Sequence, residues 1–114
     1  MNDCLFCKII QGEIPSEKIY ENESVFAFKD IKPSAKQHYL FISKSHTKNV
    51  NEMTEKEPQA LVDIHQAIKS FTRENGLEES GFRIVTNVNK NSGQVVFHTH
   101  FHVLGGEPLK GFGS

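Results

Sequence analysis

Three of the six histidines in this chain alternate within one short stretch, His98-Thr99-His100-Phe101-His102. Successive side chains of a β-strand point to opposite faces, so a strand here would place all three imidazoles on one face. Imidazole binds metal ions, exchanges protons near neutral pH and attacks electrophiles. The spacing therefore predicts a reactive or metal-binding surface, with Thr99 and Phe101 facing the core.

Two kinds of chemistry are open to this stretch. A His-X-His pair with a third histidine can hold a catalytic zinc ion that keeps one position for water. One imidazole can instead attack an electrophile while its neighbours orient it. The turn Asn91-Ser92-Gly93-Gln94 precedes the strand directly, and its backbone N–H groups could face an anion. A phosphate beside several histidines favours the nucleophile.

Cys4 and Cys7 are separated by two residues, a spacing typical of zinc ligands, although one pair needs two further ligands. The N-terminal stretch has no basic leader, and no apolar run reaches the roughly 18 residues of a membrane span. We therefore expect a cytoplasmic protein with reduced thiols, in which the pair serves a metal or a redox reaction rather than a structural disulfide.

The composition limits the range of partners. The 114 residues fit a single domain, residues 1–114, and the formal net charge is −1. Without a basic surplus, neither nucleic acid nor a membrane is expected as a partner, and an anionic ligand must be held locally. The glycine-rich segment 105–114 is expected to form a short, flexible tail.

Two helices are expected to support the histidines. Residues 5–11 predict a short N-terminal helix that ends at Gly12. Thr54-Glu55-Lys56-Glu57 has the form of a capping box, followed by apolar residues at helical spacing up to Asn75-Gly76. This pattern predicts one long helix of about 20 residues.

Five strands are expected, at residues 18–21, 25–29, 38–43, 82–87 and 95–104. Antiparallel strands with one main helix indicate an α+β fold, with a sheet of about five strands, one long helix and a short N-terminal helix.

Four stretches carry a family resemblance over nearly the whole chain: CLFCKIIQGEIPS, VFAFKDIKPSAKQHYLFISKSH, GFRIVTN and SGQVVFHTHFHVLGG. In order and spacing they resemble the histidine triad family, in its Hint branch of nucleoside phosphoramidases. The resemblance implies a HIT-like fold and a homodimer joined through the long helix and neighbouring strands. It also implies hydrolysis of the P–N bond in purine nucleoside phosphoramidates, with release of AMP or GMP.

For catalysis the resemblance implies that His100 attacks the α-phosphorus and forms a transient nucleotidyl-histidine, which water then cleaves. His102 and His38 match the supporting histidines that position and tune the nucleophile. Only a neutral imidazole has a free lone pair, so the other nitrogen of His100 is expected to keep its proton. Many relatives carry a hydroxyl residue at the position of Val95, which implies a different leaving-group preference or rate here.

The resemblance also implies a nucleotide site in which a carboxylate accepts hydrogen bonds from both ribose hydroxyls, apolar side chains sandwich the purine, and polar groups bind the phosphate. The positions are Leu5, Phe6, Ile9, Phe28, Asp30, Ile31, Asn87, Gly93, Gln94, His100 and His102.

Finally, the resemblance implies a structural Zn²⁺ site that is closed to water, with Cys4, Cys7, His46 and His98 as ligands. No organic cofactor is expected, and His65 has no matched role. Three alternatives stay open: a dinucleoside polyphosphate hydrolase, a zinc-stabilised nucleotide-binding or scaffolding protein with little catalysis, and a catalytic metallohydrolase. A nucleotidylyltransferase is disfavoured because His102 stands where those enzymes usually carry glutamine.

Overall fold

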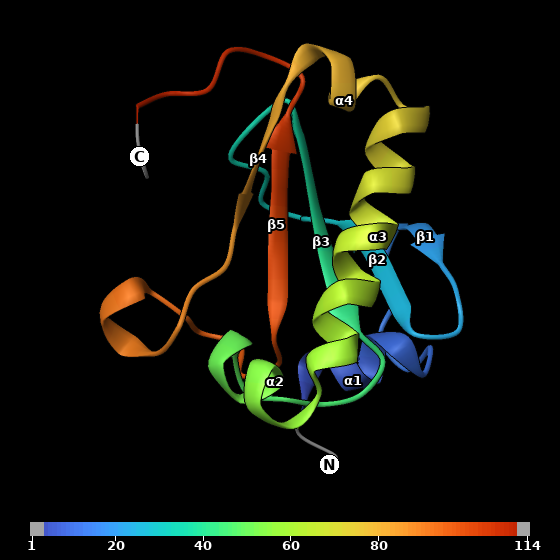
Figure 1. The fold of residues 1–114 in the computed structure, drawn as a ribbon, viewed down its shortest axis with the longest axis vertical. Coiled ribbons are helices and arrows are strands. Elements are labelled where there is room, and N and C mark those ends of the chain that lie inside the picture. Colours follow the sequence, from blue (N-terminus) through green and yellow to red (C-terminus); the bar gives the residue numbers. More distant parts are fainter. Residues whose placement is uncertain (1–3, 112–114) are drawn as a thin grey trace.

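The computed structural model of the protein describes residues 4–111. A five-stranded antiparallel sheet has the order β1-β2-β3-β5-β4 and carries the long helix α3 on one face (Figure 1). The strands are β1 (Lys18–Glu21), β2 (Val25–Lys29), β3 (Gln37–Ser43), β4 (Phe82–Val85) and β5 (His100–Gly105). The helices are α1 (Leu5–Ile10), α2 (Val50–Lys56), α3 (Pro58–Glu74) and α4 (Leu77–Ser80), and a 3-10 turn spans Lys90–Ser92. The α+β fold expected from the sequence is confirmed.

The sheet has an apolar core on each face. In β2, Val25 and Ala27 pack towards α3, whereas Phe26 and Phe28 pack towards α1. All four are buried, as expected for a strand covered on both sides. Beside the smaller of these two cores, the α1 face of the sheet carries the histidines.

β5 shows the alternation that the sequence predicted. Phe101 and Val103 belong to the core beneath α3, and His100 and His102 point to the opposite face. Their strand pairs with β3 on one side, where Ile42 lies opposite His100. β5 is an inner strand of the sheet, so β3 and β4 on either side hold the strand that carries the histidines.

The prediction of one continuous long helix that starts at Thr54 is wrong. The helical stretch is divided at Glu57 into α2 and α3, and Pro58 occupies the first turn of α3. Proline disfavours helical geometry in the residue before it, and Glu57 has φ −140° and ψ 59°.

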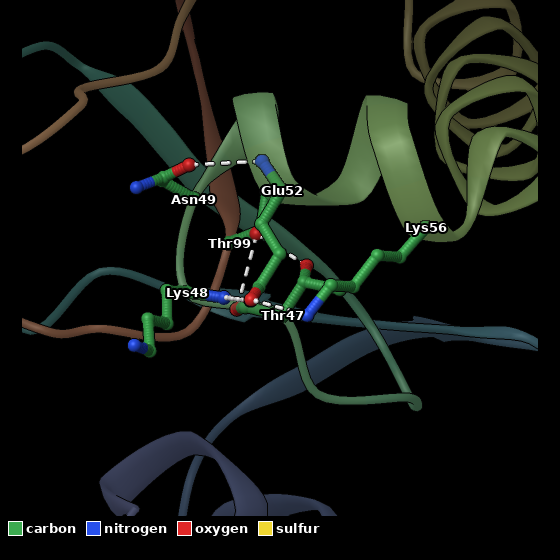
Figure 2. Close-up of polar contacts among 6 residues, drawn as sticks. All are labelled: Thr47, Lys48, Asn49, Glu52, Lys56 and Thr99. Carbon is green, nitrogen blue, oxygen red and sulfur yellow. Dashed lines mark hydrogen bonds and ion pairs between the residues drawn. The ribbon is translucent and has the colours of Figure 1, made fainter.

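The capping interaction lies five residues earlier than expected, at the start of α2. The Asn49 side chain accepts a hydrogen bond from the Glu52 N–H at 3.1 Å, and the Glu52 carboxylate accepts one from the Lys48 N–H at 2.6 Å (Figure 2). This resembles a capping box, except that the carboxylate accepts from the N–H of the residue before the N-cap. Thr54 lies inside α2, where its hydroxyl donates to the Val50 carbonyl.

The last two strands are shorter than expected. β4 ends at Val85 rather than at residue 87, and β5 begins at His100 rather than at residue 95. The residues between them form a loop held by the buried Gln94 side chain, whose amide donates to the Lys48 carbonyl at 2.8 Å. α1 ends one residue early, β3 begins one residue early, and α4 was not expected.

Hydrogen bonds attach the described part of the C-terminal segment to the sheet region. The Lys36 N–H donates to the Glu107 carboxylate at 2.8 Å, and the Arg83 guanidinium donates to the Lys110 carbonyl at 3.0 Å. Gly105 still belongs to β5, and residues 112–114 of the expected tail lie outside the described residues. Within residues 4–111, no helix has the length and apolar character needed to cross a membrane.

Candidate active site and metal centre

His100 has one ring nitrogen tied to the backbone and the other free. Its Nδ1 lies 2.8 Å from the His98 carbonyl oxygen, and a carbonyl can only accept, so Nδ1 carries the proton. Nε2 therefore keeps its lone pair and has no partner among residues 4–111. Every fully buried side-chain nitrogen or oxygen of the described residues has a hydrogen-bond partner. Nε2 is therefore accessible to a ligand.

The surroundings of His100 favour the neutral imidazole. Burial lowers the pKa of His100, against smaller raising effects of the His98 carbonyl and the Asp30 charge. The Phe6 ring meets the imidazole edge-on, with ring centroids 5.1 Å apart. A neutral histidine with an open Nε2 has the chemistry of a nucleophile.

His38 and His102 form a hydrogen-bonded pair whose tautomers follow from one backbone contact. The Ser34 N–H donates to His38 Nδ1 at 2.9 Å, so the neutral His38 carries its proton on Nε2. That proton points to His102 Nδ1 at 2.9 Å, which leaves the His102 proton on Nε2. His102 therefore presents an N–H donor towards a ligand, beside the lone pair of His100, whose ring centroid is 5.1 Å away.

Asp30 lies next to this pair. One carboxylate oxygen accepts from the Lys32 N–H at 2.8 Å, and the other is 3.4 Å from His38 Nε2. Burial lowers the pKa of His38, opposed by the Asp30 charge. Burial also lowers the pKa of His102 to about 4, with a further lowering by His100 and His38. Both histidines are therefore neutral near pH 7.

The group Asp30, His38 and His102 brings its potential ligand atoms within 4.8 Å of one another, but its hydrogen bonding does not suit a metal. A metal on His38 Nε2 would force the proton onto Nδ1, where it would face the Ser34 N–H at 2.9 Å. Two donors would then oppose each other. The arrangement fits a hydrogen-bond network better than a catalytic metal site.

The residues expected to hold a purine differ in exposure. Ile31 and Leu5 are 90% and 42% exposed, so both side chains are available to a ligand. Phe6, Ile9 and Phe28 are buried in the core beneath α1. They form the floor behind the histidines, and the Phe6 and Phe28 rings meet edge-on at 5.5 Å.

The loop expected to bind phosphate uses its donors internally. The Gly93 N–H donates to the Lys90 carbonyl, and the Gln94 N–H donates to the Asn89 carbonyl. The Gln94 side-chain amide donates to the Lys48 and Val96 carbonyls, and its oxygen accepts from the Asn89 N–H. The phosphate-binding role of Gly93 and Gln94 stays a prediction, and these contacts assign Gln94 a part in closing the loop.

Two further residues flank the site. Asn87 is half-buried, and its side chain makes no hydrogen bond within the described part of the chain. Val95 is 83% exposed, beside a surface hollow of ≈ 740 Å³ that is also lined by Leu5, Phe97 and Lys48. Its isopropyl group offers no hydrogen bond to a ligand.

Cys4, Cys7, His46 and His98 meet in one cluster, from α1 and the loops that follow β3 and precede β5. Each sulfur lies 3.3–3.5 Å from the Nδ1 atoms of both histidines. Tetrahedral zinc with ordinary Zn–S and Zn–N bonds sets these atoms about 3.6 Å apart. Two thiols and two imidazoles at this spacing fit a zinc ion.

The protonation chemistry of the cluster agrees with a cation. His98 Nε2–H donates to the Ser43 carbonyl at 2.9 Å, so the Nδ1 lone pair faces the sulfurs. Burial lowers the pKa of His98 to about 4, which keeps the ring neutral. Burial, with the Cys4 thiol next to it, raises the pKa of Cys7 to about 11. A bound cation would favour the thiolates that the protein alone disfavours.

Sequence reasoning missed the groups that fix the histidine tautomers. The Ser34 N–H and the Ser43 and His98 carbonyls are backbone atoms, so residue type gives no sign of them. It also missed Thr47, Thr86 and Thr99, whose contacts surround the nucleophile's backbone. Only Thr99, within the histidine stretch, could have drawn attention, because a polar residue stands on the face expected to be core.

Comparison with known proteins gives the family. Residues 11–109 match the model of the HIT domain. The chain is 44% identical over 103 residues to an uncharacterised HIT-like protein of Helicobacter pylori, covering 90% of this chain and 96% of that protein. It is 38% identical over 107 residues to the purine nucleoside phosphoramidase of Escherichia coli, covering 94% and 90%.

Solved structures agree over nearly the full length. A HIT family hydrolase from Clostridium thermocellum has a TM-score of 0.92 at 45% identity, with 98% of this chain and 97% of that chain covered. A histidine triad protein from Clostridium difficile has a TM-score of 0.94 at 39% identity and the same coverage. The chain belongs to the histidine triad (HIT) family.

Proposed function

We propose that this protein hydrolyses purine nucleoside phosphoramidates, cleaving the P–N bond and releasing a nucleoside monophosphate through a nucleotidyl-histidine. The orientation of His100 supports this most directly, because Nδ1–H is fixed on the His98 carbonyl and Nε2 is left free. The Escherichia coli relative named as a purine nucleoside phosphoramidase points the same way.

In the first step the His100 Nε2 lone pair attacks the α-phosphorus and forms a P–N bond to the imidazole. The bond from phosphorus to the leaving amine breaks, and the amine takes its electron pair and a proton from solvent, since Val95 has no proton to donate. The His102 Nε2–H, fixed by His38, donates a hydrogen bond to the phosphoryl oxygens as their charge develops. Asp30 accepts the hydrogen bonds of the ribose hydroxyls.

In the second step a water molecule attacks phosphorus, and the bond to His100 Nε2 breaks. The imidazole regains its lone pair, and the proton released by water leaves with solvent. Electrons and atoms balance without a redox partner or a catalytic metal. We place the zinc ion in the separate cluster of Cys4, Cys7, His46 and His98, as a structural ion.

The test compares wild type with His100→Ala on adenosine phosphoramidate. We expect the variant to lose turnover, because no other open Nε2 lone pair within residues 4–111 faces the site, and to bind AMP still. Rapid quenching at alkaline pH followed by mass spectrometry should find a nucleotidyl adduct in wild type and none in His100→Ala. Undiminished turnover in the variant would refute the mechanism.

One observation favours a second candidate, a nucleotide-binding protein with little catalysis: Val95 is exposed and offers no hydrogen bond beside the site. Wild type that binds AMP without measurable turnover would support this candidate. The same nucleophile could also attack a dinucleoside polyphosphate. Assaying that substrate beside the phosphoramidate therefore distinguishes a dinucleoside polyphosphate hydrolase from a phosphoramidase.

A further inference from the structure

The backbone around His100 lacks part of the strand pairing that supports the rest of β5. β4 ends at Val85, which lies opposite His102, so no residue of β4 lies opposite His100. β5 itself begins at His100, so residues 98 and 99 lie outside the ladder with β3. Something other than the sheet must therefore hold His100 on its β4 side and the preceding peptide on its β3 side.

A threonine hydroxyl replaces the missing strand contact on the β4 side. Thr86 follows the end of β4, and its Oγ1 donates to the His100 carbonyl at 2.8 Å. Without this side-chain donor, the carbonyl of the buried His100 would lose its hydrogen bond on this side. Thr86 thereby extends the hold on β5 past the last paired residue of β4.

Two more threonines hold the peptide that precedes His100. The Thr99 N–H donates to the Thr47 carbonyl at 2.8 Å, and the two hydroxyl oxygens are 2.6 Å apart. The Thr99 hydroxyl donates to the same carbonyl at 3.1 Å, so the Thr47 hydroxyl is the donor between the two side chains. Both side chains are buried, and they lie together beneath the start of α2 (Figure 2).

These contacts act on the atom that orients the nucleophile. The His98 carbonyl, which accepts the His100 Nδ1 proton, belongs to the peptide between His98 and Thr99. A rotation of that peptide would turn the acceptor away and release the imidazole from its orientation. Thr99 fixes one end of this peptide, and Thr86 fixes the carbonyl of His100 itself.

We propose that Thr47, Thr86 and Thr99, the threonine clasp, are positioning residues that hold the backbone of His100 so that Nε2 faces the phosphorus. The inference rests on the proposed function in which His100 is the nucleophile. The clasp does not touch the substrate. Its effect is on the orientation of the imidazole, and so on the chemical step rather than on nucleotide affinity.

The main test uses the double variant Thr47→Val/Thr99→Val. Valine keeps the shape of threonine, and removing both hydroxyls together leaves neither of them without its partner in the core. With a loosened nucleophile we expect kcat on adenosine phosphoramidate to fall about 10- to 100-fold. The KM and the affinity for AMP should stay within about twofold of wild type. Thr86→Val should lower kcat in the same way, and Thr86→Ser should restore it.

A matched control is available in α3. Thr72 is equally buried, and its hydroxyl donates to the Ile68 carbonyl at 2.8 Å. Thr72→Val removes a buried threonine hydroxyl away from the histidines and should leave kcat unchanged. Metal content is measured in every variant, so that a fall in kcat caused by loss of zinc is distinguished from one caused by loss of the threonine hydroxyls.

A second readout does not depend on the reaction. In wild type the His100 Nδ1–H should give a slowly exchanging imidazole signal by proton–nitrogen NMR. That signal should exchange rapidly in the double variant and persist in Thr72→Val. An unchanged signal with kcat within about twofold of wild type would overturn the proposal, and so would a loss of AMP binding equal to the loss of kcat. If wild type shows no turnover at all, the proposed function is wrong. The NMR comparison still tests whether the threonine clasp orients the His100 ring.

Discussion

At the scale of single residues, the histidines of this site differ because the backbone treats them differently. The His98 and His100 rings each donate to a carbonyl, but through opposite nitrogens, Nε2 and Nδ1 respectively. His38 instead accepts a backbone N–H. One ring thus presents Nδ1 to the thiols, one presents a free Nε2, and one supplies a proton to His102. Residue type alone does not distinguish the four imidazoles; backbone partners orient three of them, and His38 orients His102.

The pH dependence of activity follows from the state of His100. Its ordinary pKa would be 6.5, and burial lowers it. Protonation removes the lone pair, so a lowered pKa keeps the nucleophile active to a more acidic pH. We expect kcat/KM for adenosine phosphoramidate to be flat through neutral pH and to fall only below pH 6.5. A pH series on the metal-loaded protein measures this, and a fall already between pH 8 and 7 would contradict it.

At the scale of elements, the sequence predicted the sheet well and its edges poorly. The apolar run at residues 25–28 and the alternation along residues 100–103 are local properties of the chain, so both strands and the inward face of the second could be predicted from them. The ends of β4 and β5 depend on Gln94, which binds backbone groups from residues 48, 89 and 96. Such a contact joins distant segments, and no local pattern reports it.

The candidate site could be predicted as far as residue types carry chemistry. The cysteines and histidines of the metal cluster do meet, and so do His38 and His102. Pro58 divides the helical stretch at Glu57, and the predicted start at Thr54 is wrong because Asn49 and Glu52 provide an earlier cap that the tertiary structure selects. A rule based on sequence spacing cannot weigh such alternatives when tertiary contacts select between them.

Metal binding should stabilise α1, which contains Cys7 and has Cys4 as its N-cap. The helix has six residues, too few to be stable alone, and Cys4 and Cys7 link it to loops at His46 and His98. With free zinc at about 100 times its dissociation constant, binding adds about 2.7 kcal/mol to the free energy of unfolding. Thermal unfolding with zinc and with a chelator should therefore differ by several degrees in Tm.

Cys7→Ser provides the comparison for this metal prediction. It removes one of the four ligands and should abolish the difference in Tm between zinc and chelator. Elemental analysis of wild type should find one zinc per chain. Equal Tm values for metal-loaded and chelated wild type would show that the cluster does not couple metal binding to folding.

At the scale of the whole molecule, one surface is left incompletely covered. α3 packs on β3 and β2, so the side of β4 towards α3 is covered less well. Val62 on α3 and Ile84 on β4 are 47% and 38% exposed. A shallow apolar hollow of ≈ 460 Å³ along α3 is lined by Leu61, Val62 and His65, among others. β4 is also an edge strand, the position in a sheet at which another strand can pair.

This surface is suited to a second copy of the chain, and the homodimer implied by the family resemblance is a prediction that it supports. A symmetric pair would bury the apolar side chains of α3 and β4 against themselves. Val62→Glu would place two like charges near each other in that interface and desolvate them. We therefore expect light scattering to give wild type twice the 12.9 kDa chain mass and the variant the mass of one chain.

Ile31→Glu is the matched control, since Ile31 is 90% exposed beside the nucleotide site. This variant should stay dimeric and bind AMP less tightly. A monomeric wild type, or dissociation of Ile31→Glu as well, would contradict a dimer through this face.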